Sequence, residues 1–75
     1  VALRNANDAV GALRIMGDAY GSQAQLVTRM SELAEQSANG TLSTVQREAL
    51  DREYRALVAE YGRIGDTASY NGLQL

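Results

Sequence analysis

The chain has 75 residues, 45% of them hydrophobic and 21% charged, with a net charge of −2, so it forms at most one small domain whose apolar groups stay partly exposed. Its seven basic residues are all arginines spread among nine carboxylates, which argues against nucleic acid as a partner, and no apolar run approaches the ~20 residues of a membrane span. Because cysteine and histidine are both absent, the sequence excludes disulfides, zinc sites and imidazole acid–base catalysis, and we expect no metal, no cofactor and no enzymatic activity.

The first half of the chain carries apolar residues at spacings of three and four, which predict an amphipathic helix over about residues 2–37. One row is a heptad seam of Leu3, Ala6, Val10, Leu13, Tyr20, Ala24, Val27 and Ala34. A second row beside it contains Ala9, Ala12, Met16, Ala19, Leu26, Met30 and Leu33. Since the two rows together make a wide stripe, this helix can contact two neighbours at once.

A turn over residues 38–42 separates this helix from a second one predicted over about residues 43–65. Asn39 and Gly40 both tolerate the left-handed conformation that closes a helix. Ser43 and Gln46 have the spacing of a capping box, which starts the next helix. The apolar stripe of that second helix is Leu50, Tyr54, Leu57, Tyr61 and Ile64.

The last ten residues predict a different structure. Gly62 and Gly65 loosen the end of the second helix, and residues 66–75 are expected to form a linker and the start of a strand. Apolar and polar residues alternate around Asn71-Gly72, as they do at the entry to a β-hairpin.

The predicted fold class is therefore all-α, a single coiled-coil-like hairpin of two long antiparallel helices followed by the start of a β-hairpin. The unequal helix lengths leave the first third of the longer helix projecting, with Leu3, Val10 and Leu13 uncovered, so another segment must cover them. The predicted helix-packing core is Leu3, Val10, Leu13, Met16, Tyr20, Leu26, Val27, Met30, Leu50, Tyr54, Leu57, Tyr61 and Ile64.

Three segments carry a resemblance to a known family. They are Arg-Asn-Ala-Asn-Asp-Ala at residues 4–9, Met-Ser-Glu-Leu-Ala-Glu-Gln-Ser-Ala-Asn-Gly-Thr at residues 30–41, and Tyr-Asn-Gly at residues 70–72. In this order and spacing the chain resembles bacterial flagellin, in the N-terminal part of its D1 helical rod domain. The resemblance covers essentially all 75 residues.

The resemblance implies a part of a larger flagellin chain, exported and polymerised outside the cell as a structural subunit of the flagellar filament, with a role in motility. It implies neither catalysis nor a cofactor. The implied partners are other flagellin subunits and the C-terminal helix of the same chain, which would supply the missing cover.

The resemblance also implies recognition of the outer face by an innate immune receptor of the Toll-like class. By position, the family's recognition residues correspond to Arg29, Leu33, Gln36 and Glu53. The first three lie at i, i+4 and i+7 on one predicted helix, and a hairpin can bring Glu53 alongside them.

Several alternatives stay open at this stage. A hook-filament junction protein has a similar N-terminal helical pattern, and a stand-alone helical adaptor would also fit the periodicity. Paired carboxylates such as Glu32 and Glu35 lack the apolar surroundings that acid–base catalysis would need, so an enzyme is the remotest interpretation.

Overall fold

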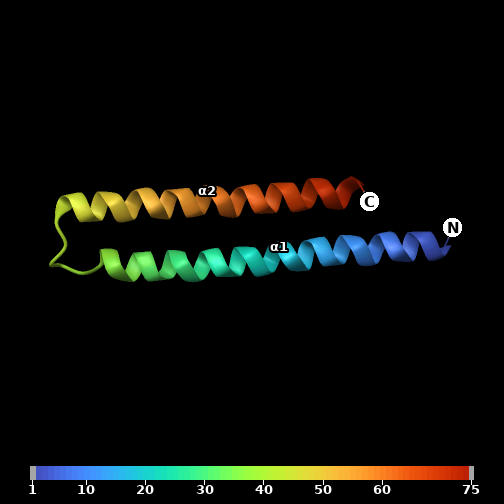
Figure 1. Cartoon of the computed structure of the whole chain (residues 1–75), viewed down its shortest axis with the longest axis horizontal. Coiled ribbons are helices and arrows are strands. Elements are labelled where there is room, and N and C mark those ends of the chain that lie inside the picture. Colours follow the sequence, from blue (N-terminus) through green and yellow to red (C-terminus); the bar gives the residue numbers. More distant parts are fainter. Residues whose placement is uncertain (1, 75) are drawn as a thin grey trace.

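The computed structural model describes residues 2–74, with side chains described for residues 2–72, and folds them into a hairpin of two helices (Figure 1). Helix α1 covers Ala2–Ser37 and helix α2 covers Thr44–Gln74. They run antiparallel in a rod with extents of 62 × 16 × 9 Å. The predicted all-helical hairpin is confirmed, and no strand is present among residues 2–74.

The rows of α1 are divided between two environments. The residues that face α2, called here the inner row, are all buried or half-buried: Asp8, Ala12, Ile15, Ala19, Gln23, Leu26, Met30, Leu33 and Ser37. Leu33 is only 1% exposed. The heptad seam, called here the open seam and including Gly17 and Ser31 in its repeat, is exposed at every position from Leu3 to Ala34.

The predicted core is correspondingly split. Leu26, Met30, Leu50, Leu57 and Ile64 are half-buried between the helices, as expected. The other eight members are exposed in this hairpin, namely Leu3, Val10, Leu13, Met16, Tyr20, Val27, Tyr54 and Tyr61. These eight lie beside the helix–helix contact and not in it. Leu3, Val10 and Leu13 were expected to be left uncovered by α2, and the packing of all eight against other helices stays a prediction.

The connection between the helices follows the predicted capping box. The backbone N–H of Ser43 donates to Gln46 Oε1 at 2.9 Å, and the N–H of Gln46 donates to Ser43 Oγ at 3.1 Å. Asn39 Oδ1 accepts from the N–H of Thr41 at 3.0 Å, which fixes the turn. The left-handed closure expected at Asn39-Gly40 is not formed, since no described residue has a positive φ. The turn is held by side-chain acceptors instead.

The predicted linker and strand start at residues 66–75 are wrong for residues 66–74, where α2 continues as a helix to Gln74; Leu75 lies outside the described residues. Two physical reasons account for the longer helix. The first is packing, because Ala68 is only 8% exposed and so extends the contact of α2 with α1. A strand needs a partner for its backbone groups and residues 2–74 supply none, whereas a helix satisfies them internally.

The longer α2 also corrects the predicted overhang of α1. Gly72 lies beside Asn5, Asp8, Ala9 and Ala12, so α2 reaches nearly to the start of its partner. Only the first turns of α1 extend past it (Figure 1). Val10 and Leu13 are therefore exposed because they point away from α2, and not because α2 ends before reaching them.

Candidate functional site

The hairpin presents two unlike faces on either side of the helix–helix contact. One, called here the open apolar face, carries Met16, Tyr20 and Val27 of α1 and Tyr54, Val58 and Tyr61 of α2, all at least 40% exposed. The other, called here the polar face, is centred on Arg29 and Glu53. Arg29 and Val27 are two residues apart, which separates them by ~200° around the helix axis.

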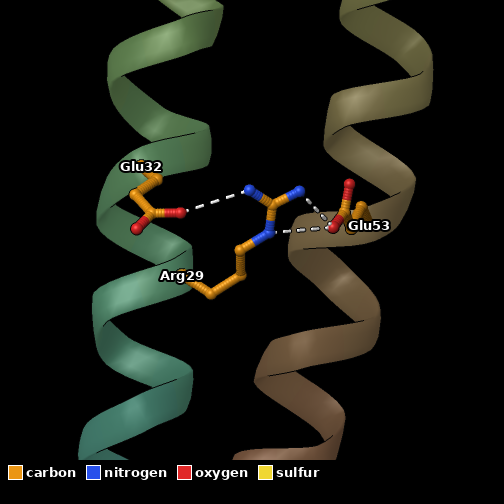
Figure 2. Close-up of polar contacts among 3 residues, drawn as sticks. All are labelled: Arg29, Glu32 and Glu53. Carbon is orange, nitrogen blue, oxygen red and sulfur yellow. Dashed lines mark hydrogen bonds and ion pairs between the residues drawn. The ribbon is translucent and has the colours of Figure 1, made fainter.

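Arg29 joins α1 to α2 on the polar face (Figure 2). Its Nη2 and Nε donate to Glu53 Oε1 at 2.8 and 3.1 Å, and its Nη1 donates to Glu32 Oε2 at 3.2 Å. The guanidinium thus uses both edges, one toward each carboxylate. The hairpin therefore brings Arg29 and Glu53 together, as the sequence predicted.

The Arg29 cluster is accessible to solvent. The side chains of Arg29, Glu32 and Glu53 are 42%, 54% and 44% exposed. Hydrogen bonds to Glu53, and secondarily to Glu32, raise the pKa of Arg29 above its ordinary value, so the guanidinium stays charged. Because water screens such a pair, its main effect is to hold three charged groups in a fixed pattern at the surface.

The other two residues of the predicted receptor site are placed differently. Gln36 is exposed on α1, where a partner can reach it. Leu33 is 1% exposed and points toward α2, so the hairpin does not present its side chain beside Arg29, and its contact with a receptor stays a prediction. Its position is rotated by ~40° from Arg29 around the helix, which is enough to move it from the polar face into the interior.

Hollows lie along the open apolar face and were not predicted. One is lined by Tyr20, Gln23, Ala24, Val27 and Tyr61. Another is lined by Met16, Ala19, Tyr20, Gln23, Gly65, Ala68, Ser69 and Gly72. The signal for the second was present in the sequence, because Gly65, Ala68, Ser69 and Gly72 place small side chains along one side of α2, and small side chains leave a hollow.

No group of three or more acidic side chains in the described part of the chain is placed to hold a metal ion. In the same residues, no helix is apolar enough over a sufficient length to cross a bilayer.

Comparison with known proteins identifies the family. The model of the bacterial flagellin N-terminal helical region matches residues 1–75. The chain belongs to the bacterial flagellin family. Among named flagellins, it is 44% identical to flagellin A of Vibrio anguillarum and 43% identical to flagellin A of Vibrio cholerae, over 75 residues in each case. It is 41% identical to polar flagellin C of Vibrio parahaemolyticus over the same length.

The match covers all of this flagellin chain but only part of each relative. The alignments include 100% of the 75 residues and 20% of each of these three flagellins. No solved structure matches the chain significantly. The family resemblance reached from three short segments is therefore confirmed over the whole chain.

Proposed function

We propose that this chain is the N-terminal helical part of a structural subunit of the bacterial flagellar filament, within the D1 rod of a larger flagellin. The subunit acts outside the cell, in motility, and has no enzymatic activity. The match to the flagellin family supports this proposal. The observation that carries it is the open seam, a long apolar surface that the hairpin leaves uncovered.

The open seam has the repeat of a coiled-coil surface. Its positions alternate by threes and fours without a break and are exposed throughout, from Leu3 to Ala34. At 1.5 Å per residue the seam is about 46 Å long. A strict seven-residue repeat stays in contact with a partner helix only if the two wind around each other in a left-handed supercoil. The seam therefore fits a long helix rather than a small ligand.

We assign that helix to the C-terminal part of the same polypeptide, and the remaining apolar surface to neighbouring subunits. Leu13 and Tyr20 are 66% and 71% exposed. Burying side chains of this size contributes ~1.5–3 kcal/mol each, so covering the seam supplies a large driving force for association. The exposed Tyr54 and Tyr61 of α2 border the same face. The C-terminal helix, the third helix of the proposed assembly, can therefore contact α2 as well as α1.

Substitution along the seam tests this function. In the intact protein, Leu13→Asp and Val27→Asp place a charge in the proposed helix contact, so we expect loss of filaments in electron micrographs and in sedimentation assays. Gln25→Asp is the matched control, because Gln25 is exposed on α1 outside the seam. Filaments formed equally well by all three variants would overturn the proposal.

A second function is favoured by the Arg29–Glu53 pair. We propose that a Toll-like receptor recognises the polar face through Arg29, Gln36 and Glu53. The pair is pre-organised, since both side chains are held by hydrogen bonds of 2.8 and 3.1 Å. Pre-organised groups lose less freedom on binding. Leu33 supports this surface only from beneath.

Receptor binding by the intact protein tests the polar face. Arg29→Ala and Glu53→Ala should each weaken binding at least tenfold. Arg55→Ala is the control, because Arg55 is 79% exposed and paired with Asp51 within α2. Binding that is unchanged in both test variants, or lowered equally in the control, would contradict the assignment.

Two alternatives make different predictions. A hook-filament junction protein belongs to the same machinery, and the relatives named above are all flagellins. A stand-alone adaptor should keep full helicity when the 75-residue chain is diluted to a demonstrated monomer. For the flagellin part we expect helicity, measured by circular dichroism, to fall on dilution, because the open seam then loses its cover.

A further inference from the structure

Gln23 is a polar residue in the otherwise mostly apolar middle of the inner row. It lies between Ala19 and Leu26 and is half-buried against α2. Its side-chain Nε2 donates a hydrogen bond to the backbone carbonyl of Tyr61 at 3.1 Å. An apolar side chain would fill this position without any bond, so the amide needs an explanation beyond packing.

Gly65 provides the space that the Gln23 amide occupies. A Cβ built on Gly65 would lie 3.2 Å from Gln23 Nε2, closer than most Cβ contacts. The glycines on either side along α2, Gly62 and Gly72, have nothing within 4 Å of such an atom. Gly65 is also four residues after Tyr61, so its own N–H is the helical partner of the carbonyl that Gln23 reaches. The amide and the glycine fit each other.

The contact lies where the inner row changes its spacing. From Ala12 the row advances by three to Ile15, then by four to Ala19 and by four again to Gln23. A heptad would have used Ser22 instead, and Ser22 is exposed. Because a straight helix drifts by ~20° per heptad, the repeated step of four turns the row back toward α2 at this point.

We propose that Gln23, seated against Gly65, sets the register and the rotation of α1 against α2 in the middle of the rod. A half-buried amide in an apolar helix contact favours one alignment where only one place has room for it. Opposite Gly65 the amide reaches a backbone carbonyl of α2, whereas a shift of one turn would set it against Tyr61 or Ser69, whose Cβ atoms would narrow that space. The capping box fixes the helices at the loop end. Gln23 fixes them far from the loop, where the loop has less control.

This alignment has a consequence for the open apolar face. Tyr20 of α1 and Tyr61 of α2 line one hollow, and Gln23 lies in the same hollow. Displacing α1 by one turn would move Tyr20 away from Tyr61. Gln23 is thus a positioning residue. It keeps Tyr20 of α1 next to Tyr61 of α2 on the open apolar face.

Distance measurements between spin labels test the proposal in the intact protein. Labels at Asp18→Cys on α1 and Asp66→Cys on α2 occupy exposed positions in a segment that contains no cysteine of its own. The parent should give one narrow distance. Gln23→Met keeps the length of the side chain but cannot donate, so a second distance should appear, from hairpins in which α1 has shifted along α2 by one helical turn, about 5 Å. Gln25→Met, at an exposed position of the same helix, is the control and should keep one distance.

Gly65→Ala gives an independent test that does not depend on losing the amide. The added methyl displaces Gln23 Nε2 by a few tenths of an ångström, which weakens its bond to Tyr61. The second distance should therefore appear, in a smaller fraction of molecules than in Gln23→Met, even though alanine favours the helix. Gly62→Ala gains the same propensity in open space and should keep one distance. A single unchanged distance in both Gln23→Met and Gly65→Ala would overturn the proposal. If Gln23→Met loses helicity, the comparison of Gly65→Ala with Gly62→Ala decides by itself.

Discussion

The two sides of α1 carry rows of similar apolar content but opposite exposure. The inner row packs on α2 and contains Leu33, which is 1% exposed. The open seam contains Leu3, Leu13 and Tyr20, which are 76%, 66% and 71% exposed. The difference lies in side-chain size as well as in spacing. The inner row has small side chains at Ala12 and Ala19, which allow close approach of α2, whereas the seam mixes small residues with the large, exposed Leu3, Leu13 and Tyr20.

The comparison shows that one helix can carry two rows of apolar residues with different spacings, each suited to a different partner helix. A row that steps by three and four with one extra four stays on a nearly straight line, which suits the neighbouring helix of a short hairpin. An unbroken heptad row winds around the helix and suits a long supercoiled partner. The open seam is then a contact surface in its own right, and not an incomplete part of the hairpin core.

The largest expected effect distinguishes the two rows directly. Leu33→Ala removes the most buried side chain and should lower the free energy of unfolding by ~2–5 kcal/mol, because it leaves a cavity between the helices. In the isolated 75-residue chain, at a dilution where no second chain covers the seam, Leu13→Ala should change stability by no more than ~0.5 kcal/mol, since Leu13 is 66% exposed. Urea unfolding followed by circular dichroism measures both values.

The same two variants in the intact protein sharpen this result. There Leu13→Ala should become destabilising, because the third helix covers the seam, while the effect of Leu33→Ala should persist. Equal effects of Leu13→Ala in the isolated and the intact chains would show that nothing covers the seam.

A smaller effect is expected at the loop, which holds both rows in place. Ser43→Ala removes the Oγ that accepts from the N–H of Gln46, so the free energy of unfolding should fall by ~1 kcal/mol. Thr44→Ala, at the first residue of α2, is the control and should have a smaller effect. Thermal unfolding of the two variants side by side is the measurement. A loss no larger for Ser43→Ala than for Thr44→Ala would rule out the capping role.

Sequence reasoning predicted the parts of this molecule that depend on local chemistry. Periodicity gave the bounds of α1, and the Ser43–Gln46 spacing gave the start of α2. It did not predict which row of α1 faces α2, because both rows are amphipathic and ranking by large apolar residues favours the exposed seam. The burial of Leu33 was missed for the same reason, since a rotation of ~40° around the helix decides between surface and interior.

The C-terminal end of α2 was mispredicted because its local signal is outweighed by packing. Asn71-Gly72 is a strong turn signal, yet Ala68 packs against α1 and the helix continues past both residues. The cross-helix pair of Arg29 and Glu53 was predicted only through the family resemblance. Their separation of 24 residues in sequence has no periodic signature.

The end of α2 provides the next test of how far the inner row is covered. Gly72 lies beside Ala9 and Ala12 of α1, with nothing within 4 Å of an added Cβ. Gly72→Ala should therefore stabilise the last turns of α2 by up to ~1 kcal/mol and slow amide hydrogen exchange there. Slowing should extend to the turns of α1 around Ala9 and Ala12, which lie beside Gly72. Faster exchange in the variant would mean that these residues are not helical in solution.

The smallest expected effect is a pH dependence on α2. A hydrogen bond from Arg63 lowers the pKa of Glu60 below its ordinary 4.5. The folded state thus binds the proton of Glu60 more weakly than the unfolded state does, so this contribution to stability is present above about pH 4.5 and is lost as the pH falls through the lowered pKa. Arg29 adds no such dependence, because its hydrogen bonds to Glu53 and Glu32 raise its pKa and it stays charged over this range. Urea midpoints at several pH values between about 2 and 7 should therefore differ less for Glu60→Gln than for the parent. Glu48→Gln, an exposed position of the same helix, should retain the parent's dependence on pH.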